Sequence, residues 1–297
     1  MNSFDDIFDA PQSRSSRNDQ PFDKAAWGER KQAERQAVYD LADTTAMAVA
    51  VDGGKFQQYL DVQARFGRYT ATNALLILAQ MPQATKVKDF DGWKDSGASI
   101  KKHQKGVSIL EPGDEYVRED GSRGTSYNVK KVFDISQTTA RAAKPAPAVD
   151  DRTLLKALIR NPPVPIQTVD ELQGNMGALY DHNQQVIFVR RGMSAPDIFR
   201  SVSKELAHAE LAAANEGYSR KGAALAAYSV SYMLCRQHGI DVSGHDFSRA
   251  PDSFRDADPQ TVRTALTEIR DTADDISKRM SRALEQNKAP KAKGQER

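Results

Sequence analysis

The chain has 297 residues, of which 39% are hydrophobic and 28% are charged, and its formal net charge is +2. This length allows two modest domains that each bury a core, and the nearly balanced charge says nothing about nucleic acid. The apolar runs are shorter than the about 18 residues that span a bilayer, and Met1–Asp6 lacks the basic-then-apolar form of a signal peptide. The single cysteine, Cys235, excludes an internal disulfide and a Cys-rich zinc site. We therefore expect a cytoplasmic protein that makes no membrane contact.

The first half of the chain is predicted to begin with helices and to continue with short strands. Apolar positions recur at the spacing of one helical face, and the apolar run that begins at Thr72 stops before Pro82. Further on, two strand-like runs flank the turn-forming segment 119–124, which is typical of a hairpin loop. In chain order, we predict helices at 31–52, 55–66 and 72–80 and strands at 107–111 and 127–133.

The second half is predicted to be mainly helical. Gln185–Arg190 is predicted to be a strand, and Pro196 then opens a helix, because proline is favoured in the first helical turn. Two further helices are predicted at about 219–238 and 259–285. The expected fold is α+β with two domains: N-terminal helices with a small antiparallel sheet, and a mainly helical C-terminal domain with a short sheet edge.

Composition places the domain boundary near the middle of the chain. Ala142–Asp151 contains two prolines among alanines, which favours an extended linker, and a second proline cluster follows at Asn161–Pro165. Both ends of the chain are polar, as is typical of segments without a core. The predicted units are a disordered tail at 1–30, a first domain at 31–140, a linker at 141–165, a second domain at 166–286 and a basic tail at 287–297.

The first candidate functional region is the basic segment, residues 86–105. It contains six lysines and three aspartates, with Phe90 and Trp93 among them. Lysines follow phosphates without regard to sequence, and a flat ring can stack on a base, which is worth about 1–3 kcal/mol per base. The pattern is therefore typical of single-stranded DNA or RNA binding, although composition alone does not favour this interpretation over the alternative. The alternative is a solvated lysine-rich face in which Trp93 anchors the core.

The second candidate is the segment from Lys204 to His208, which reads Lys-Glu-Leu-Ala-His. A zinc-protease helix carries His-Glu-x-x-His, in which two imidazoles one turn apart hold zinc and the glutamate activates the bound water. Glu205 and His208 are in register with that motif, but Lys204 takes the place of the first ligand. An ammonium has no lone pair for a cation. The helix is therefore predicted to keep the shape of a catalytic helix without its chemistry.

Three ordered blocks in the first half resemble the N-terminal domain of the ArdC/LtrC antirestriction family of plasmids and conjugative elements. The blocks are Phe66–Gln80, Gly92–Pro112 and Val132–Thr138. In this family the N-terminal domain binds single-stranded DNA and the C-terminal domain has a zinc-metallopeptidase fold. Together with the basic segment, the resemblance implies a DNA-binding surface at Arg68, Tyr69, Asn73, Phe90, Trp93, Lys94, Lys101, Lys102 and Lys105. For Asn73 and Trp93, a purely structural role is the alternative.

The resemblance continues in the second half. Gly177–Val189 is similar to the strand that precedes the family's metal helix, and Ser201–Leu211 is similar to that helix. The family's third ligand is a glutamate on the next helix, and Tyr228 stands at that position. Two of three ligands are thus missing, whereas catalytic zinc normally has three protein ligands and a water. A rebuilt site would have to draw on His182, His238, His245, Glu210 and Glu216.

We therefore predict a single-stranded-DNA-binding accessory or antirestriction-type protein of a plasmid or conjugative element, with a peptidase-like domain that has lost its zinc ligands. No cofactor is expected, zinc included, and a non-catalytic role is favoured. Lys204 is expected to pair with Glu205 or Tyr228 if it replaces the charge of the metal. Besides DNA, a restriction, replication or transfer protein is a candidate partner. One alternative is an active metal-dependent peptidase with an unusual ligand set around Glu205 and His208, and another is a protein-interaction module.

Overall fold

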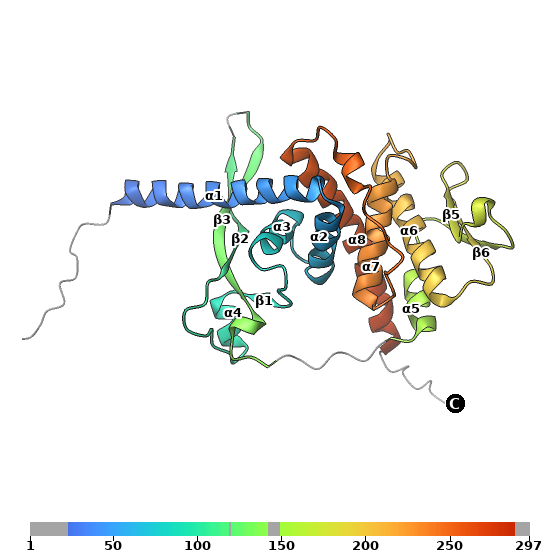
Figure 1. Ribbon diagram of the computed structural model, residues 1–297, viewed down its shortest axis with the longest axis horizontal. Helices are drawn as coiled ribbons and strands as arrows, with labels where there is room; N and C mark the ends of the chain where they lie inside the picture. The colour runs from blue at the N-terminus through green and yellow to red at the C-terminus, as the bar shows by residue number, and fades with distance from the viewer. Residues whose placement is uncertain (1–22, 119, 142–148, 289–297) are drawn as a thin grey trace, which may run out of the picture.

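The computed structural model describes residues 23–118, 120–141 and 149–288. The predicted α+β class is confirmed, because helices are combined with two small sheets. Figure 1 shows the two sheets at opposite ends of a central group of helices that includes α2, α7 and α8. None of the helices in the described ranges combines the length and apolar character that a membrane-spanning helix needs.

The N-terminal half contains the first sheet, in the strand order β1-β3-β2, with both strand pairs antiparallel. The predicted helices and the predicted hairpin are confirmed, and the strands run further than expected. The elements are α1 (Lys24–Ala50), α2 (Gly53–Arg65), α3 (Ala71–Gln80), β1 (Val87–Lys88), α4 (Phe90–Asp95), β2 (Val107–Val117) and β3 (Arg123–Asp134).

The C-terminal half contains the second sheet, in the order β4-β6-β5, where β4 is parallel and β5 antiparallel to β6. The predicted strand and the three predicted helices are confirmed, although α7 begins later than expected, after turns in the segment 215–223. The elements are α5 (Asp151–Leu158), β4 (Ile166–Val169), β5 (Ala178–Asp181), β6 (Val186–Arg190), α6 (Ala195–Ala214), α7 (Ala224–His238) and α8 (Pro259–Lys288).

Side-chain oxygens set the start of the helices that matter for the candidate sites. Asp89 accepts a hydrogen bond from the Gly92 N–H at the start of α4, and Ser194 accepts one from the Asp197 N–H at the start of α6. Such caps satisfy N–H groups that have no partner inside the helix. Pro196 lies in the first turn of α6, where its missing N–H costs nothing.

Two amide side chains on one face of α3 hold this helix against strand β2. The Asn73 side chain bonds the backbone N–H and C=O of Leu110 at 2.8 Å each, and the Gln80 side chain bonds the same two groups of Ser108 at 2.9 Å each. Strand β2 is an edge strand, so these backbone groups have no neighbouring strand to pair with. Residues seven apart lie on the same helical face. Asn73 and Gln80 can therefore both reach β2, one at Leu110 and the other at Ser108.

Helix α8 connects the two halves of the structure. Its buried residues recur at alternating steps of four and three, and they pack on α1, α3, α5, α6 and α7. One hydrophobic cluster consequently contains buried residues from both halves of the chain. The buried residues of this stripe are Val262, Leu266, Ile269, Ala273, Ile276, Met280 and Ala283.

Several predicted boundaries fall partly outside the described ranges. Residues 1–22 of the predicted tail, 142–148 of the predicted linker and 289–297 of the predicted basic tail lie outside them. Within the predicted linker, α5 buries Leu154 and Leu158 in the core cluster. The division into two domains stays a prediction.

Candidate functional site

The basic segment, residues 86–105, consists of β1, α4 and the loop that follows α4. Phe90 begins α4 with 60% of its surface exposed, which is unusual for a phenylalanine. Lys94, Lys101, Lys102 and Lys105 are all exposed, and in the described part of the chain no ion pair involves any of them. The segment therefore presents an aromatic ring and four lysines without an ion pair to solvent, of which Lys101 also donates to the Ser136 carbonyl at 2.9 Å.

A glutamine behind the loop holds the lysines in place. The Gln137 side chain donates to the Lys105 carbonyl at 2.8 Å, and the Gln137 carbonyl accepts from the Lys101 N–H at 2.9 Å. Gln137 is fixed in turn by Asp134, because the two residues form a capping box around a short 3-10 helix. The sequence block that ends at Thr138 therefore positions the loop that carries Lys101 and Lys105.

Trp93 and Asn73 are buried, in contrast to the other residues predicted at the DNA surface. Trp93 is only 2% exposed, and its indole N–H donates to the Phe133 carbonyl at 2.8 Å. Asn73 is 6% exposed, and its side-chain amide donates to the Leu110 carbonyl and accepts from the Leu110 N–H. These contacts favour the structural role for both residues, because a base would have to displace core packing to stack on Trp93.

Arg68 and Tyr69 lie beside a cavity of about 540 Å³ in the N-terminal half. The cavity lies between α3 and the first sheet, and Asn73 and Asp89 also line it. The structure thus brings Arg68, Tyr69 and Asn73 together next to the start of α4. The other predicted DNA contacts, in the basic segment, are not among the residues that line this cavity.

In the C-terminal half, Glu205 is fully buried and held by three hydrogen bonds. The Arg220 guanidinium donates to both carboxylate oxygens, at 2.8 and 2.9 Å, and the Tyr180 N–H donates at 2.9 Å. The Lys204 ammonium lies 3.4 Å from the same carboxylate. Lys204 therefore does pair with Glu205, but the bidentate partner is Arg220.

These contacts set the protonation state of Glu205. Burial alone would raise the pKa of this carboxyl group, but the hydrogen bonds from Arg220 and Tyr180 outweigh burial and hold the pKa below its ordinary value. The carboxylate is therefore charged at neutral pH and engaged with a guanidinium. A general base needs a pKa near the working pH and a free oxygen directed at a water, and Glu205 has neither.

His208 is also buried, one turn after Lys204 on α6. Its Nδ1 is hydrogen-bonded to the Tyr218 hydroxyl at 3.1 Å. Burial lowers the pKa of His208 to about 4, so the imidazole is neutral at physiological pH. Tyr218 and Arg220 both come from the segment between α6 and α7, which therefore closes over the two motif residues.

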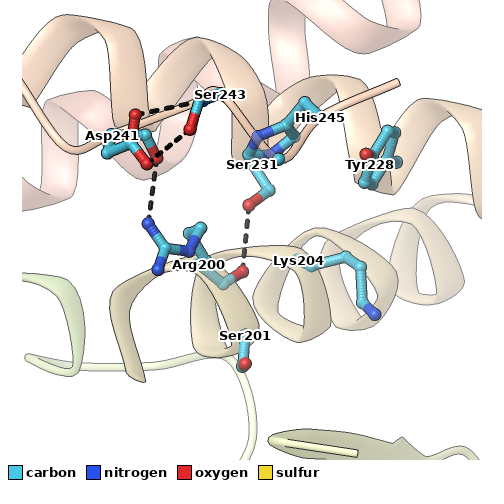
Figure 2. Close-up of a pocket in the computed structure, with 9 residues that line it drawn as sticks. Arg200, Ser201, Lys204, Tyr228, Ser231, Asp241, Ser243 and His245 are labelled. Atoms are coloured by element: carbon cyan, nitrogen blue, oxygen red, sulfur yellow. Dashed lines mark hydrogen bonds between the residues drawn. The ribbon is translucent and has the colours of Figure 1, made fainter. Parts of the chain in front are cut away.

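Lys204 and Tyr228 lie between two adjacent cavities of about 330 and 500 Å³. Figure 2 shows the smaller one, with Lys204 on α6 and Tyr228 on α7; the Lys204 ammonium points away from the Tyr228 ring, and the Arg200 guanidinium donates to the Asp241 carbonyl at 2.9 Å. The Tyr228 hydroxyl accepts from the Asp246 N–H at 3.0 Å. No direct contact joins Lys204 to Tyr228 among the described residues.

The arrangement does not fit a bound divalent metal ion. No group of three His, Cys, Asp or Glu side chains is close enough to hold a metal within the described ranges. At the motif, Arg220 places a positive charge where a metal ion would have to approach Glu205. The candidates for a rebuilt site are dispersed: His182 contacts Tyr180 and Tyr218, His238 packs on Phe199, His245 on Tyr228 and Tyr232, and Glu210 pairs with Arg279.

The sequence motif gave no indication of Arg220 or Tyr218. Both follow the motif by ten residues or more, in a segment without a recognisable pattern. The available signal was the lysine at the first ligand position, because a buried carboxylate needs a positive charge nearby. That requirement does not specify which of the 42 Lys and Arg residues supplies it.

Two solved structures of the antirestriction protein ArdC from plasmid R388 have a fold similar to that of this chain. The Mn(II)-bound structure has a TM-score of 0.50 at 18% identity and covers 72% of this chain and 85% of its own. The metal-free structure has a TM-score of 0.49 at 19% identity and covers 72% and 86%. No family model and no curated protein matches the sequence. The resemblance to ArdC predicted from the sequence is thus confirmed for the fold.

The expectation that this protein has no cofactor is contradicted by the comparison with ArdC. An ArdC structure with the same fold is described as Mn(II)-bound, so the fold can carry a divalent ion. The prediction rested on the loss of two ligands in the motif, and ligand identity at two positions does not determine what a whole fold can bind. The misfit described above concerns the residues around Glu205 in this chain.

Proposed function

We propose that this protein binds single-stranded DNA through the basic segment together with Arg68 and Tyr69. The supporting observation is the exposure of Phe90 beside four lysines that have no ion-pair partner in the part of the chain that the structure describes. Such lysines release counterions when they meet phosphates, and an exposed ring gives a base a surface on which to stack. Duplex DNA keeps its bases paired and stacked, so it gains only the first of these two contributions.

The C-terminal half is assigned a non-catalytic role in this proposal. The salt bridge between Glu205 and Arg220 keeps the shape of the peptidase-like helix and removes the carboxylate from acid–base chemistry. By likeness to the R388 protein, whose structures are described as antirestriction, the chain is proposed to act as an antirestriction-type accessory protein of a plasmid or conjugative element. A restriction, replication or transfer protein is the candidate protein partner.

The test is a binding titration with labelled single-stranded and duplex oligonucleotides of the same sequence. We expect tighter binding of the single strand and a steep loss of affinity with salt. The variant Lys101→Gln/Lys102→Gln/Lys105→Gln is expected to reduce the salt slope by about 2, since each phosphate contact contributes about 0.7 for single strands. Equal affinity for both forms of DNA would overturn the proposal.

A matched control separates local contacts from total charge. Lys55, Lys156 and Lys221 are exposed and lie outside the basic segment, so their replacement by glutamine removes the same three charges elsewhere. The salt slope of this control is expected to stay at the parent value. An equal drop in both triple variants would mean that binding depends on net charge alone.

A metal-dependent peptidase is the second candidate function, because a structure with this fold is described as Mn(II)-bound. This function requires cleavage of a protein substrate that a chelator stops and that Glu205→Gln abolishes. Cleavage that persists in Glu205→Gln would point to a contaminating protease. If the parent protein cleaves the substrate and Glu205→Gln does not, the C-terminal half is a peptidase and the non-catalytic assignment is wrong.

A further inference from the structure

The cavity beside Tyr69 is lined by apolar, aromatic and charged side chains. Its volume is about 540 Å³, within the range typical of small-molecule sites. The rings of Tyr69 and Tyr127 line it. Tyr69 comes from the connection between α2 and α3, and Tyr127 comes from β3. The apolar part of its lining consists of Val87, Ile109, Leu110, Pro112 and Val132. A flat, mostly apolar group with a polar edge suits such a space.

Part of the polar lining is a triad of charged side chains, Asp89, Glu111 and Lys130. The Lys130 ammonium lies 2.8 Å from the Asp89 carboxylate and 2.7 Å from the Glu111 carboxylate. Hydrogen bonds from Lys130 and from the Gly92 N–H lower the pKa of Asp89, so it is ionised at neutral pH. The triad therefore carries one net negative charge and offers carboxylate oxygens as acceptors.

The positions of the charges distinguish a base from a phosphate. The triad would repel a phosphate, because its only cation is already shared between two carboxylates. Arg68 and Lys88 also line the cavity and carry positive charge without an ion pair in the ranges that the structure describes. A nucleotide can therefore place its phosphate near Arg68 or Lys88 and its base against the tyrosines and the triad.

We propose that this cavity holds one unstacked nucleobase and selects bases that carry an exocyclic amine, so that cytosine is preferred to thymine. The inference rests on the proposed binding of single-stranded DNA and adds base selectivity to it. The second Glu111 oxygen has no hydrogen bond among the described residues, and it can accept from the cytosine amine. Thymine presents a carbonyl oxygen at the same position, and two acceptors cannot bond each other.

The experiment compares oligo(dC) with oligo(dT) of equal length in the same salt at about pH 8. Because one good base contact discriminates by roughly five- to a hundredfold, we expect about tenfold tighter binding of oligo(dC). In Glu111→Gln the amide can also donate to the thymine carbonyl, so the preference is expected to fall below about threefold. Glu115→Gln is the matched control, since Glu115 lies on the same strand outside the cavity, and it is expected to keep the full preference.

Crosslinking locates the base directly. An oligonucleotide with one photoreactive iodinated cytosine is expected to crosslink to Tyr69 or Tyr127, identified by mass spectrometry. Crosslinks only elsewhere, equal binding of oligo(dC) and oligo(dT), or an unchanged preference in Glu111→Gln would overturn base selection and leave single-strand binding intact. Failure of both oligonucleotides to bind would instead remove the proposed function together with this inference.

Discussion

Replacement of Arg220 by methionine tests the assignment of Glu205 as a structural ion-pair partner. Methionine keeps much of the side-chain length but removes the guanidinium that donates to both carboxylate oxygens. Glu205 is fully buried, so the variant leaves it with the Tyr180 N–H and the more distant Lys204 ammonium. Loss of one partner of a buried ion pair usually costs about 3–5 kcal/mol.

Two effects lower this loss of stability: the partial exposure of Arg220 and the ability of Glu205 to take up a proton. Arg220 keeps 38% of its side chain exposed, so water screens part of the interaction. Glu205 can also escape by taking up a proton, which from its ordinary pKa of 4.5 costs about 3.4 kcal/mol at pH 7 and about 0.7 kcal/mol at pH 5. We therefore expect Arg220→Met to lose about 2–3 kcal/mol of unfolding free energy at pH 7 and about 1 kcal/mol or less at pH 5.

The assay is urea unfolding followed by circular dichroism at both pH values. Lys204→Met is the matched control, because its ammonium is 3.4 Å from Glu205 and 36% exposed, and it should lose no more than about 1 kcal/mol. The double variant Glu205→Leu/Arg220→Met should recover most of the stability, since an apolar pair of similar size often replaces a buried ion pair without loss. Equal losses in Arg220→Met and Lys204→Met, or a loss that does not depend on pH, would refute the reasoning.

Three further predictions concern the scaffold. Asn73→Ala removes the amide that bonds the backbone N–H and C=O of Leu110. Thermal unfolding should therefore show that the free energy of unfolding falls by about 2–4 kcal/mol. The folded-state pKa of His208 is depressed to about 4, so its stabilising contribution is present above about pH 6.5 and is lost as the pH falls toward 4; His208→Gln should flatten the stability–pH curve in that window. Gly53→Ala would drive its methyl group into the backbone of Phe247, so urea unfolding is expected to show a loss of about 1–3 kcal/mol in the free energy of unfolding. Unchanged stability would show that the loop can shift.

Local pattern was sufficient for the longer helices and for strands β2, β3 and β6, but it did not predict the short elements β1, α4 and β4. Apolar spacing located the helices and Pro196 located the start of α6, because these signals act within one or two turns of the chain. The common face of Lys204, Glu205 and His208 also followed from the sequence, since residues one turn apart on a helix are neighbours. The same is true of the lysine-rich character of the basic segment.

Contacts between distant residues were decided by the tertiary structure alone. Arg220 reaches Glu205 from the segment after α6, and Lys130 joins Asp89 to Glu111 across β2, β3 and α4. No local pattern encodes such pairings, because each depends on how elements far apart in sequence pack together.

The tertiary structure also decided which of the predicted DNA-contact residues are exposed and which are buried. Phe90 and Trp93 are three positions apart, yet α4 turns one ring to solvent and the other into the core. Local sequence signals therefore located the longer helices and strands and the residue types that they carry. Packing determined which side chains remain available for binding, because burial is a property of the assembled elements and not of the residue.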